Sequence, residues 1–249
     1  MLHAVDGARG DALLMCPPLL QDGIRSQRAL WSLAQAQAVA GTTVLRFDWF
    51  GSGDSAGDSR ELSWAGLQDD LGAAVSALRD LSGVARPHQL ALRSAALPVL
   101  ARAASNNEPV DLVLWDPHLL GSAVVDDWRQ QHRQQLHEAG RYPFGSDGNA
   151  ADELIGFDLD PAWLDTLARQ DANQWPLPAG SRVLLAVWEM TPALQQYAAR
   201  QREAGVAVDV LTFDVADAPL FDDPNLFESL ALPRRSVAQL ARNLSGGAP

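Results

Sequence analysis

Residues 88–104 read HQLALRSAALPVLARAA, and this stretch decides the fold. The short apolar run at 89–92 predicts a buried strand, and the alanine-rich run at 95–104 predicts a helix that follows through a very tight turn. Short apolar runs alternate with longer amphipathic stretches on both sides of this segment. Because such alternation forms βαβ units, we predict an α/β, doubly wound, mostly parallel sheet with helices on both faces.

The remaining elements follow from the same alternation. Strands are predicted at residues 12–16, 43–47, 110–115, 183–187 and 206–213, and helices at 25–39, 64–81, 192–204 and 234–244. The alternation breaks between Gly121 and Trp175, where we expect helices at 125–139 and 161–169 around a glycine-rich stretch at 145–148. We therefore predict a single domain over residues 1–249, with a helical lid or cap insertion at 122–178.

Composition excludes several classes of function. The chain has 249 residues and one cysteine, Cys16. Its formal net charge is -12, so it lacks the basic face that nucleic-acid binding requires. All 19 basic residues are arginine, which excludes a Schiff-base lysine, lysine-anchored pyridoxal phosphate and a P-loop lysine. One cysteine excludes an intramolecular disulfide and a cysteine-cluster metal site. We expect no cofactor, no metal, no membrane span, no signal peptide and a cytoplasmic location.

A motif typical of a serine nucleophile, GxSxG, occurs once, as GDSAG at residues 53–57. The serine of this motif normally sits on a sharp turn from a strand to a helix. Here the strand should end near Asp48 and the helix should begin near Ser63, so loop residues separate Ser55 from both. We interpret 53–57 as a loop whose glycines permit a left-handed backbone.

The sharp turn that a nucleophile requires is predicted instead after the strand at 89–92, although the usual flanking glycines are absent. Two registers are open. With Ser94 at the tip of the turn, Leu92 and an alanine would occupy the two glycine positions. With Arg93 at the tip, two small alanines would occupy them, which fits better but puts arginine where the nucleophile belongs.

Three further segments, in this order and spacing, resemble the α/β-hydrolase superfamily. They are PPLLQDGIRSQR at 17–28, RFDWFGSGDSAG at 46–57 and VLWDPHLLG at 113–121. More narrowly, the chain resembles bacterial hydrolase-like proteins associated with exosortase and exopolysaccharide gene clusters, related to the serine-aminopeptidase-like hydrolases. The stretch DELIGFDLDPAWLDTLARQD at 152–171 also resembles the end of their insert. The resemblance implies an α/β-hydrolase-like fold with a nucleophile, an acid and a histidine in that order along the chain.

The triad that this resemblance implies is incomplete. Glu189, which follows a predicted strand, can fill the role of the acid. The loop that should carry the histidine, residues 214–221, reads DVADAPLF, and no histidine occurs after His137. Asp214 and Asp217 are the only replacement bases in that loop, and either would need a pKa raised by burial. A serine without a base is a poor nucleophile at neutral pH.

Other residues indicate a binding site. The planar guanidinium of Arg93 would hold a carboxylate or phosphate, beside the backbone amide of Leu19. His118 lies just past a predicted strand, near the edge where an α/β crevice opens, and is either a loop histidine or a replacement base. Trp188 and other tryptophans at strand ends belong either to the core or to a pocket for a small acyl- or sugar-containing ligand. Whether the chain forms a homo-oligomer stays open.

Two functions therefore compete. The first is a pseudo-hydrolase with a degenerate triad, which binds a ligand or partner in an exosortase or exopolysaccharide system. The second is a weak or non-standard serine esterase or acyl hydrolase that acts on ester or thioester bonds. In that case Ser94 is the nucleophile, Glu189 the orienting acid, and backbone amides near Leu19 and Ser94 the oxyanion donors. Since this fold hosts many functions, the fold alone does not choose between them.

Overall fold

The computed structural model describes residues 1–3, 10–138, 153–218 and 233–246, with the backbone alone for residues 135–138. The glycine-rich stretch expected at 145–148 lies outside the described residues. So do residues 219–221, the end of the loop in which a histidine was sought.

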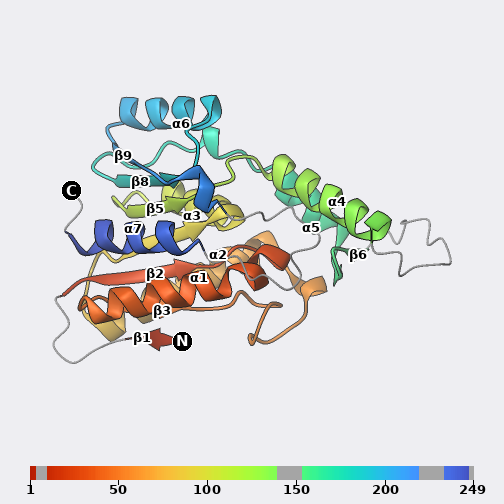
Figure 1. The fold of residues 1–249 in the computed structure, drawn as a ribbon, viewed down its shortest axis with the longest axis horizontal. Coiled ribbons are helices and arrows are strands. Elements are labelled where there is room, and N and C mark those ends of the chain that lie inside the picture. The colour runs from red at the N-terminus through yellow and green to blue at the C-terminus, as the bar shows by residue number, and fades with distance from the viewer. Residues whose placement is uncertain (4–9, 139–152, 219–232, 247–249) are drawn as a thin grey trace.

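Within these described residues, seven strands form one sheet in the order β1-β3-β2-β4-β5-β8-β9 (Figure 1). The strands are β1 (Leu2–His3), β2 (Ala12–Cys16), β3 (Thr43–Arg46), β4 (His88–Leu92), β5 (Asp111–Trp115), β8 (Arg182–Val187) and β9 (Ala207–Thr212). β1 runs antiparallel to β3, and every other neighbouring pair is parallel. The doubly wound, mostly parallel sheet predicted from the sequence is confirmed. β1 was not predicted, because a strand of two residues has no periodicity to detect.

Helices cover both faces of this sheet. One face carries α1 (Leu20–Val39) and α7 (Arg234–Ser245), which lie side by side, and the other carries α2 (Trp64–Ser82), α3 (Ala96–Ser105) and α6 (Pro192–Glu203). Successive strand residues enter opposite layers, since Leu13 packs in the layer of α1 whereas Leu14 packs in the layer of α2. Burial on both faces explains why the strands read as continuous apolar runs. None of the helices in the described residues is both long and apolar enough to cross a bilayer.

Between β5 and β8 the chain leaves the sheet. This insertion contains α4 (Gly121–Glu138), a hairpin of β6 (Glu153–Leu154) and β7 (Phe157–Asp158), and α5 (Pro161–Ala168). Figure 1 shows α4, α5 and β6 projecting together beyond one end of the sheet. The rings of Trp128 and Trp163 stack at 6.1 Å and join α4 to α5. The two helices touch so closely that a Cβ added at Gly121 would lie 1.7 Å from the carbonyl oxygen of Leu167.

Two helices begin earlier than the sequence pattern predicts. α1 begins at Leu20 instead of residue 25, and α4 begins at Gly121 instead of residue 125. The missed turn, residues 20–24, buries the charged side chain of Asp22 and exposes the apolar side chain of Ile24. Because apolar periodicity detects only a hydrophobic buried face, it missed a turn that buries a charged side chain.

Candidate functional site

The bend after β4 has an arginine at its tip. The strand ends at Leu92, and a short 3-10 turn, η2 (Arg93–Ala95), leads directly into α3. Arg93 has φ +49°, in the left-handed region that costs a non-glycine residue roughly 1–2 kcal/mol. The residues two positions before and after it, Ala91 and Ala95, are small and fully buried. The geometry therefore corresponds to the second of the two registers.

This bend lies where the strand order of the sheet reverses. From β2 the chain goes to β3 on one side and then crosses to β4 on the other, so the loops after β2 and β4 separate there. Ligands of open α/β sheets bind in the crevice at such a point. Three of the four non-glycine residues with left-handed backbone in the described ranges, Leu20, Arg93 and Asp116, follow β2, β4 and β5 at this edge. Strained backbone of this kind concentrates at functional sites.

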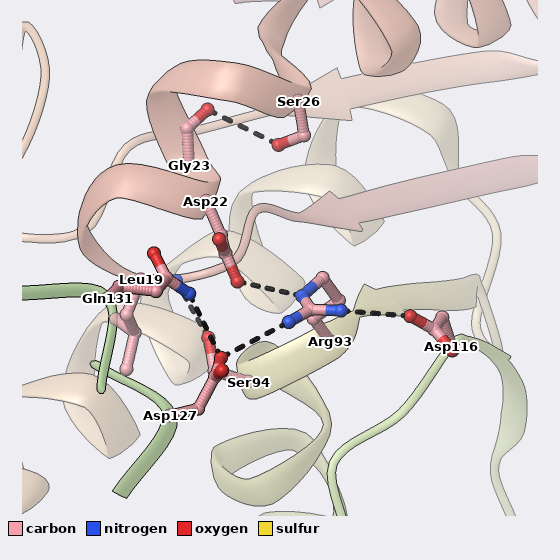
Figure 2. Close-up of polar contacts among 9 residues, drawn as sticks. All are labelled: Leu19, Asp22, Gly23, Ser26, Arg93, Ser94, Asp116, Asp127 and Gln131. Atoms are coloured by element: carbon pink, nitrogen blue, oxygen red, sulfur yellow. Dashed lines mark hydrogen bonds and ion pairs between the residues drawn. The ribbon is translucent and has the colours of Figure 1, made fainter. Parts of the chain in front are cut away.

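The guanidinium of Arg93 joins three carboxylates from three different elements (Figure 2). Its Nε donates to Asp22 Oδ2 of α1 at 2.7 Å, and its Nη1 donates to Asp116 Oδ2, just past β5, at 3.0 Å. Its Nη2 lies 3.5 Å from Asp127 Oδ2 of α4. Burial lowers the pKa of Arg93, but the carboxylates of Asp22 and Asp116 outweigh that effect, so its pKa is raised. The guanidinium stays charged and ties α1 and α4 to the sheet.

Two acceptor atoms beside this cluster are enclosed without a hydrogen-bond partner among the described residues. They are Asp22 Oδ1 and Gln131 Oε1, on side chains that belong to residues 1% and 4% exposed. Gln131 is part of the same network, because its Nε2 donates to Asp127 Oδ2 at 3.1 Å. Buried polar atoms in folded proteins are nearly always hydrogen-bonded, so these two acceptors call for a donor from a ligand or a water molecule.

Ser94 is buried and hydrogen-bonded, unlike an exposed nucleophile. It is 1% exposed, and its Oγ accepts a hydrogen bond from the backbone N–H of Leu19 at 2.9 Å. Serine hydrolases of this architecture use an amide in the loop after the corresponding strand as an oxyanion donor. In this chain that amide already has an acceptor within the protein. No imidazole in the described part of the chain hydrogen-bonds to Ser94 Oγ.

His118 lies beside the arginine cluster. Its backbone N–H donates to the carbonyl oxygen of Arg93 at 3.2 Å. Burial and, to a smaller extent, the positive charge of Arg93 together lower the pKa of His118 to about 3. The imidazole is therefore neutral at physiological pH, with one nitrogen that donates and one that accepts.

The other residues predicted at this edge form no hydrogen bond or ion pair with Ser94 among the described residues, and Trp188 has partners elsewhere. Glu189 follows β8 on an exposed position, and no hydrogen bond or ion pair among the described residues joins it to Ser94 or to an imidazole. Trp188 is 8% exposed and donates its indole N–H to Ser236 Oγ at 3.2 Å. Its ring also packs at 5.2 Å from that of Phe213. Trp188 thus forms part of the packed layer beneath α7.

Both aspartates considered as replacement bases accept hydrogen bonds near the start of a helix. Asp217 Oδ2 accepts from the backbone N–H of Ser236 at 2.7 Å and from its hydroxyl at 2.8 Å, near the start of α7. Asp214 Oδ1 accepts from the N–H of Ala216 at 3.0 Å. Ser55, in the GxSxG match, donates its hydroxyl to the carbonyl oxygen of Asp48 at 2.7 Å and so closes its own loop. In the described ranges, no group of three or more histidine, cysteine, aspartate or glutamate side chains is arranged so that it could hold a metal ion.

Sequence reasoning missed the three carboxylates that hold Arg93. Asp22, Asp116 and Asp127 come from distant parts of the chain, and none has a local pattern that marks it. One signal was present: an arginine at a tight turn between two buried elements needs anionic partners. Aspartates next to strand ends, such as Asp116, were the natural candidates.

Comparisons with known proteins identify the fold. No family model and no curated protein matches the chain. Among solved structures, Est1E from Butyrivibrio proteoclasticus with bound ferulic acid has a TM-score of 0.62 at 14% identity, over 85% of this chain and 84% of that one. The esterase domain of a Rhodothermus marinus protein has a TM-score of 0.58 at 16% identity, over 98% and 89%. A serine hydrolase without a lid from Xanthomonas campestris has a TM-score of 0.56 at 17% identity, over 99% and 85%. The chain therefore has the α/β-hydrolase fold, shared with esterases and lipases at low identity.

Proposed function

We propose that this protein is a pseudo-hydrolase, an α/β-hydrolase-fold protein that binds a small ligand or a partner and has lost triad chemistry. The observation that carries the proposal is Arg93, which occupies the left-handed tip of the bend after β4 with three carboxylates around its guanidinium. In catalytically active α/β-hydrolases, the nucleophile occupies that tip. A guanidinium stays protonated in proteins, so Arg93 acts neither as nucleophile nor as base.

Two further features support the loss of catalysis. The Leu19 amide, which would stabilise an oxyanion, is bonded to Ser94 Oγ instead. The sequence also has no histidine after His137, whereas the triad base should follow the last strand. Without a base, a serine hydroxyl loses several orders of magnitude in rate.

The chemistry of the enclosed acceptors indicates the ligand. Asp22 Oδ1 and Gln131 Oε1 would accept hydrogen bonds from hydroxyl or ammonium groups, as in a sugar or a hydroxylated acyl compound. The neutral imidazole of His118 would add one donor or acceptor. Arg93 would orient the carboxylates around the ligand. Est1E was solved with ferulic acid, so ferulate is a reasonable first probe.

The insertion would act as a cap over this ligand. Within residues 122–178, α4 carries both Asp127 and Gln131, so it contributes directly to the proposed binding groups. A link to exosortase or exopolysaccharide systems rests on the sequence resemblance alone, and we keep it as part of the proposal.

A labelling experiment tests the proposal. The purified protein is incubated with a fluorophosphonate probe and with short p-nitrophenyl esters, beside an active esterase as positive control. We expect neither labelling nor turnover. An Arg93→Ser variant, which puts a hydroxyl at the tip, should also stay inactive, because the sequence has no histidine where the triad base belongs. Turnover by the wild-type protein or by Arg93→Ser would refute the proposal.

The alternative remains a weak esterase that uses Ser94 and Glu189. In this alternative, the Leu19 amide would have to leave Ser94 Oγ and stabilise the oxyanion once an ester is bound. The alternative predicts labelling that disappears in Ser94→Ala and persists in Ser55→Ala, whereas the reverse pattern would move the nucleophile to the GxSxG loop. A lower turnover by Glu189→Gln than by the wild-type protein would support Glu189 as the acid.

A further inference from the structure

A concave site lies at the opposite edge of the sheet from Arg93. It is a pocket of about 80 Å³ near the amino ends of β4 and β5, between α2 and α3. Its charged lining comes from four segments, with Arg79 from α2, Arg102 from α3, Arg86 before β4 and Glu108 before β5. Ser76, Gln89 and Asn106 add uncharged polar side chains.

The charge of this pocket is opposite to that of the chain. The whole protein carries a formal charge of -12, whereas the pocket is lined by three guanidinium groups and one carboxylate. Arg79 and Glu108 are 3.8 Å apart at their nearest charged atoms, too far for a hydrogen bond, and both are substantially exposed. Their loose pairing leaves the positive charge of the pocket only partly neutralised.

The other two arginines are held in place by the protein. Arg86 Nη2 donates to the carbonyl oxygens of Val110 and Gly180, at 3.0 Å and 3.1 Å, and also pairs with the carboxylate of Asp111. In contrast, Arg86 Nε is enclosed and has no hydrogen-bond partner among the described residues. Nε is thus the one enclosed donor of this guanidinium that lacks an acceptor among the described residues, and an acceptor from a bound molecule would satisfy it.

Arg102 depends on a glycine in the facing helix. Its Nη1 donates to the carbonyl oxygen of Gln68 at 3.1 Å, and a Cβ added at Gly72 would lie 2.8 Å from its Nη2. Glycine inside a helix lowers helix stability, so its presence at this position has a cost. The missing side chain lets the guanidinium lie against the backbone of α2, at the wall of the pocket.

We propose that this pocket binds a phosphate-sized oxyanion, either free phosphate or the phosphate group of a small phosphomonoester. The planar, donor-rich guanidinium matches the oxygens of phosphate, and three of them would surround the group. The volume of about 80 Å³ is well below the roughly 300 Å³ at which pockets begin to hold drug-sized ligands. Only the charged group itself would therefore be enclosed, with the rest of an ester in solvent. This site is independent of the function proposed at Arg93.

Isothermal titration of the full chain, at low and constant ionic strength, tests the site. The probes are inorganic phosphate, glycerol phosphate and acetate. We expect phosphate or glycerol phosphate to bind with a Kd below 1 mM, on the order of ten times more tightly than acetate. Whichever of the two phosphate probes binds more tightly identifies the source, and either result supports the site.

Variants at the rim separate the site from general anion effects. Arg79→Gln should weaken phosphate binding at least about tenfold, because it removes a charged donor without breaking a buried pair. Glu108→Gln should strengthen binding about threefold or more by removing a like charge. Arg235→Gln, which removes the same charge from an exposed position near Asp214, is the matched control and should bind as the wild type does. Absence of phosphate binding, equal binding of acetate, or equal effects of Arg79→Gln and Arg235→Gln would overturn the proposal.

Discussion

Replacing Arg93 with methionine tests how much the buried cluster depends on its cation. The substitution leaves Asp22, whose side chain is 2% exposed, without a counter-charge. Removing one partner of a buried ion pair typically costs about 3–5 kcal/mol, because the remaining charge is buried and uncompensated. Asp116 and Asp127 are 35% and 25% exposed, so water solvates them partly and they add little to this cost. We expect a loss of about 3–5 kcal/mol in the free energy of unfolding.

The measurement is urea unfolding followed by tryptophan fluorescence at pH 7, on a chain with eight tryptophans. The matched control is Arg60→Met, since Arg60 pairs with Asp158 at 2.8 Å with both side chains 57% exposed. An exposed pair of this kind contributes about 0–1 kcal/mol. Adding Asp22→Leu to Arg93→Met should recover about 2 kcal/mol or more, because apolar groups can replace a buried ion pair. The reasoning fails if Arg93→Met costs no more than Arg60→Met, or if the double variant is no more stable than the single one.

Three further predictions concern single groups. Ser94→Ala should lower the free energy of unfolding by about 1–3 kcal/mol in urea titrations, because it leaves the buried N–H of Leu19 without an acceptor. Acid should destabilise the protein between pH 6.5 and about 3, because the pKa of His118 falls from 6.5 to about 3 on folding and the unfolded chain then binds the extra proton. His118→Gln should flatten this slope by up to about 1.4 kcal/mol per pH unit, measured as unfolding free energy against pH. Gly121→Ala should cost about 1–3 kcal/mol or more in thermal unfolding, since its Cβ would lie 1.7 Å from Leu167 O.

Each of these has its own control. Ser94→Thr keeps the hydroxyl, so a loss equal to that of Ser94→Ala would point to packing instead of the hydrogen bond. An unchanged pH slope in His118→Gln would mean that other groups take up the proton. Gly83→Ala tests a glycine with no neighbour within 4 Å but φ +71°, so it should lose only the roughly 1–2 kcal/mol of backbone strain.

The fold could be predicted from local pattern because the sheet is buried on both faces. The strand at Ala12–Cys16 was predicted at its observed bounds, and β4 and β5 were placed to within one residue. Every residue of such strands contacts a hydrophobic layer, so the apolar run itself marks them. The short strands at Leu2–His3 and in the β6–β7 hairpin were not predicted, because two residues are too few to show hydrophobic periodicity.

The candidate site could be predicted only in part. The tight turn and the two competing registers at Arg93 and Ser94 were visible in the residues that flank it, and so was the absence of a histidine after His137. The carboxylates were not visible, because Asp22 and Asp127 are separated from Arg93 by 71 and 34 residues. No periodicity links positions that far apart.

Sequence by itself determined the alternation of strands and helices, the excess of negative charge and the absence of the expected base, since each depends on residue identity or short-range spacing. Tertiary structure alone decided that the arginine takes the tip of the bend, that three aspartates surround it and that the neighbouring serine binds the Leu19 amide. The physical reason is that electrostatic and hydrogen-bond partners are selected by distance in space, and that distance exists only once the strands have paired and the helices have packed.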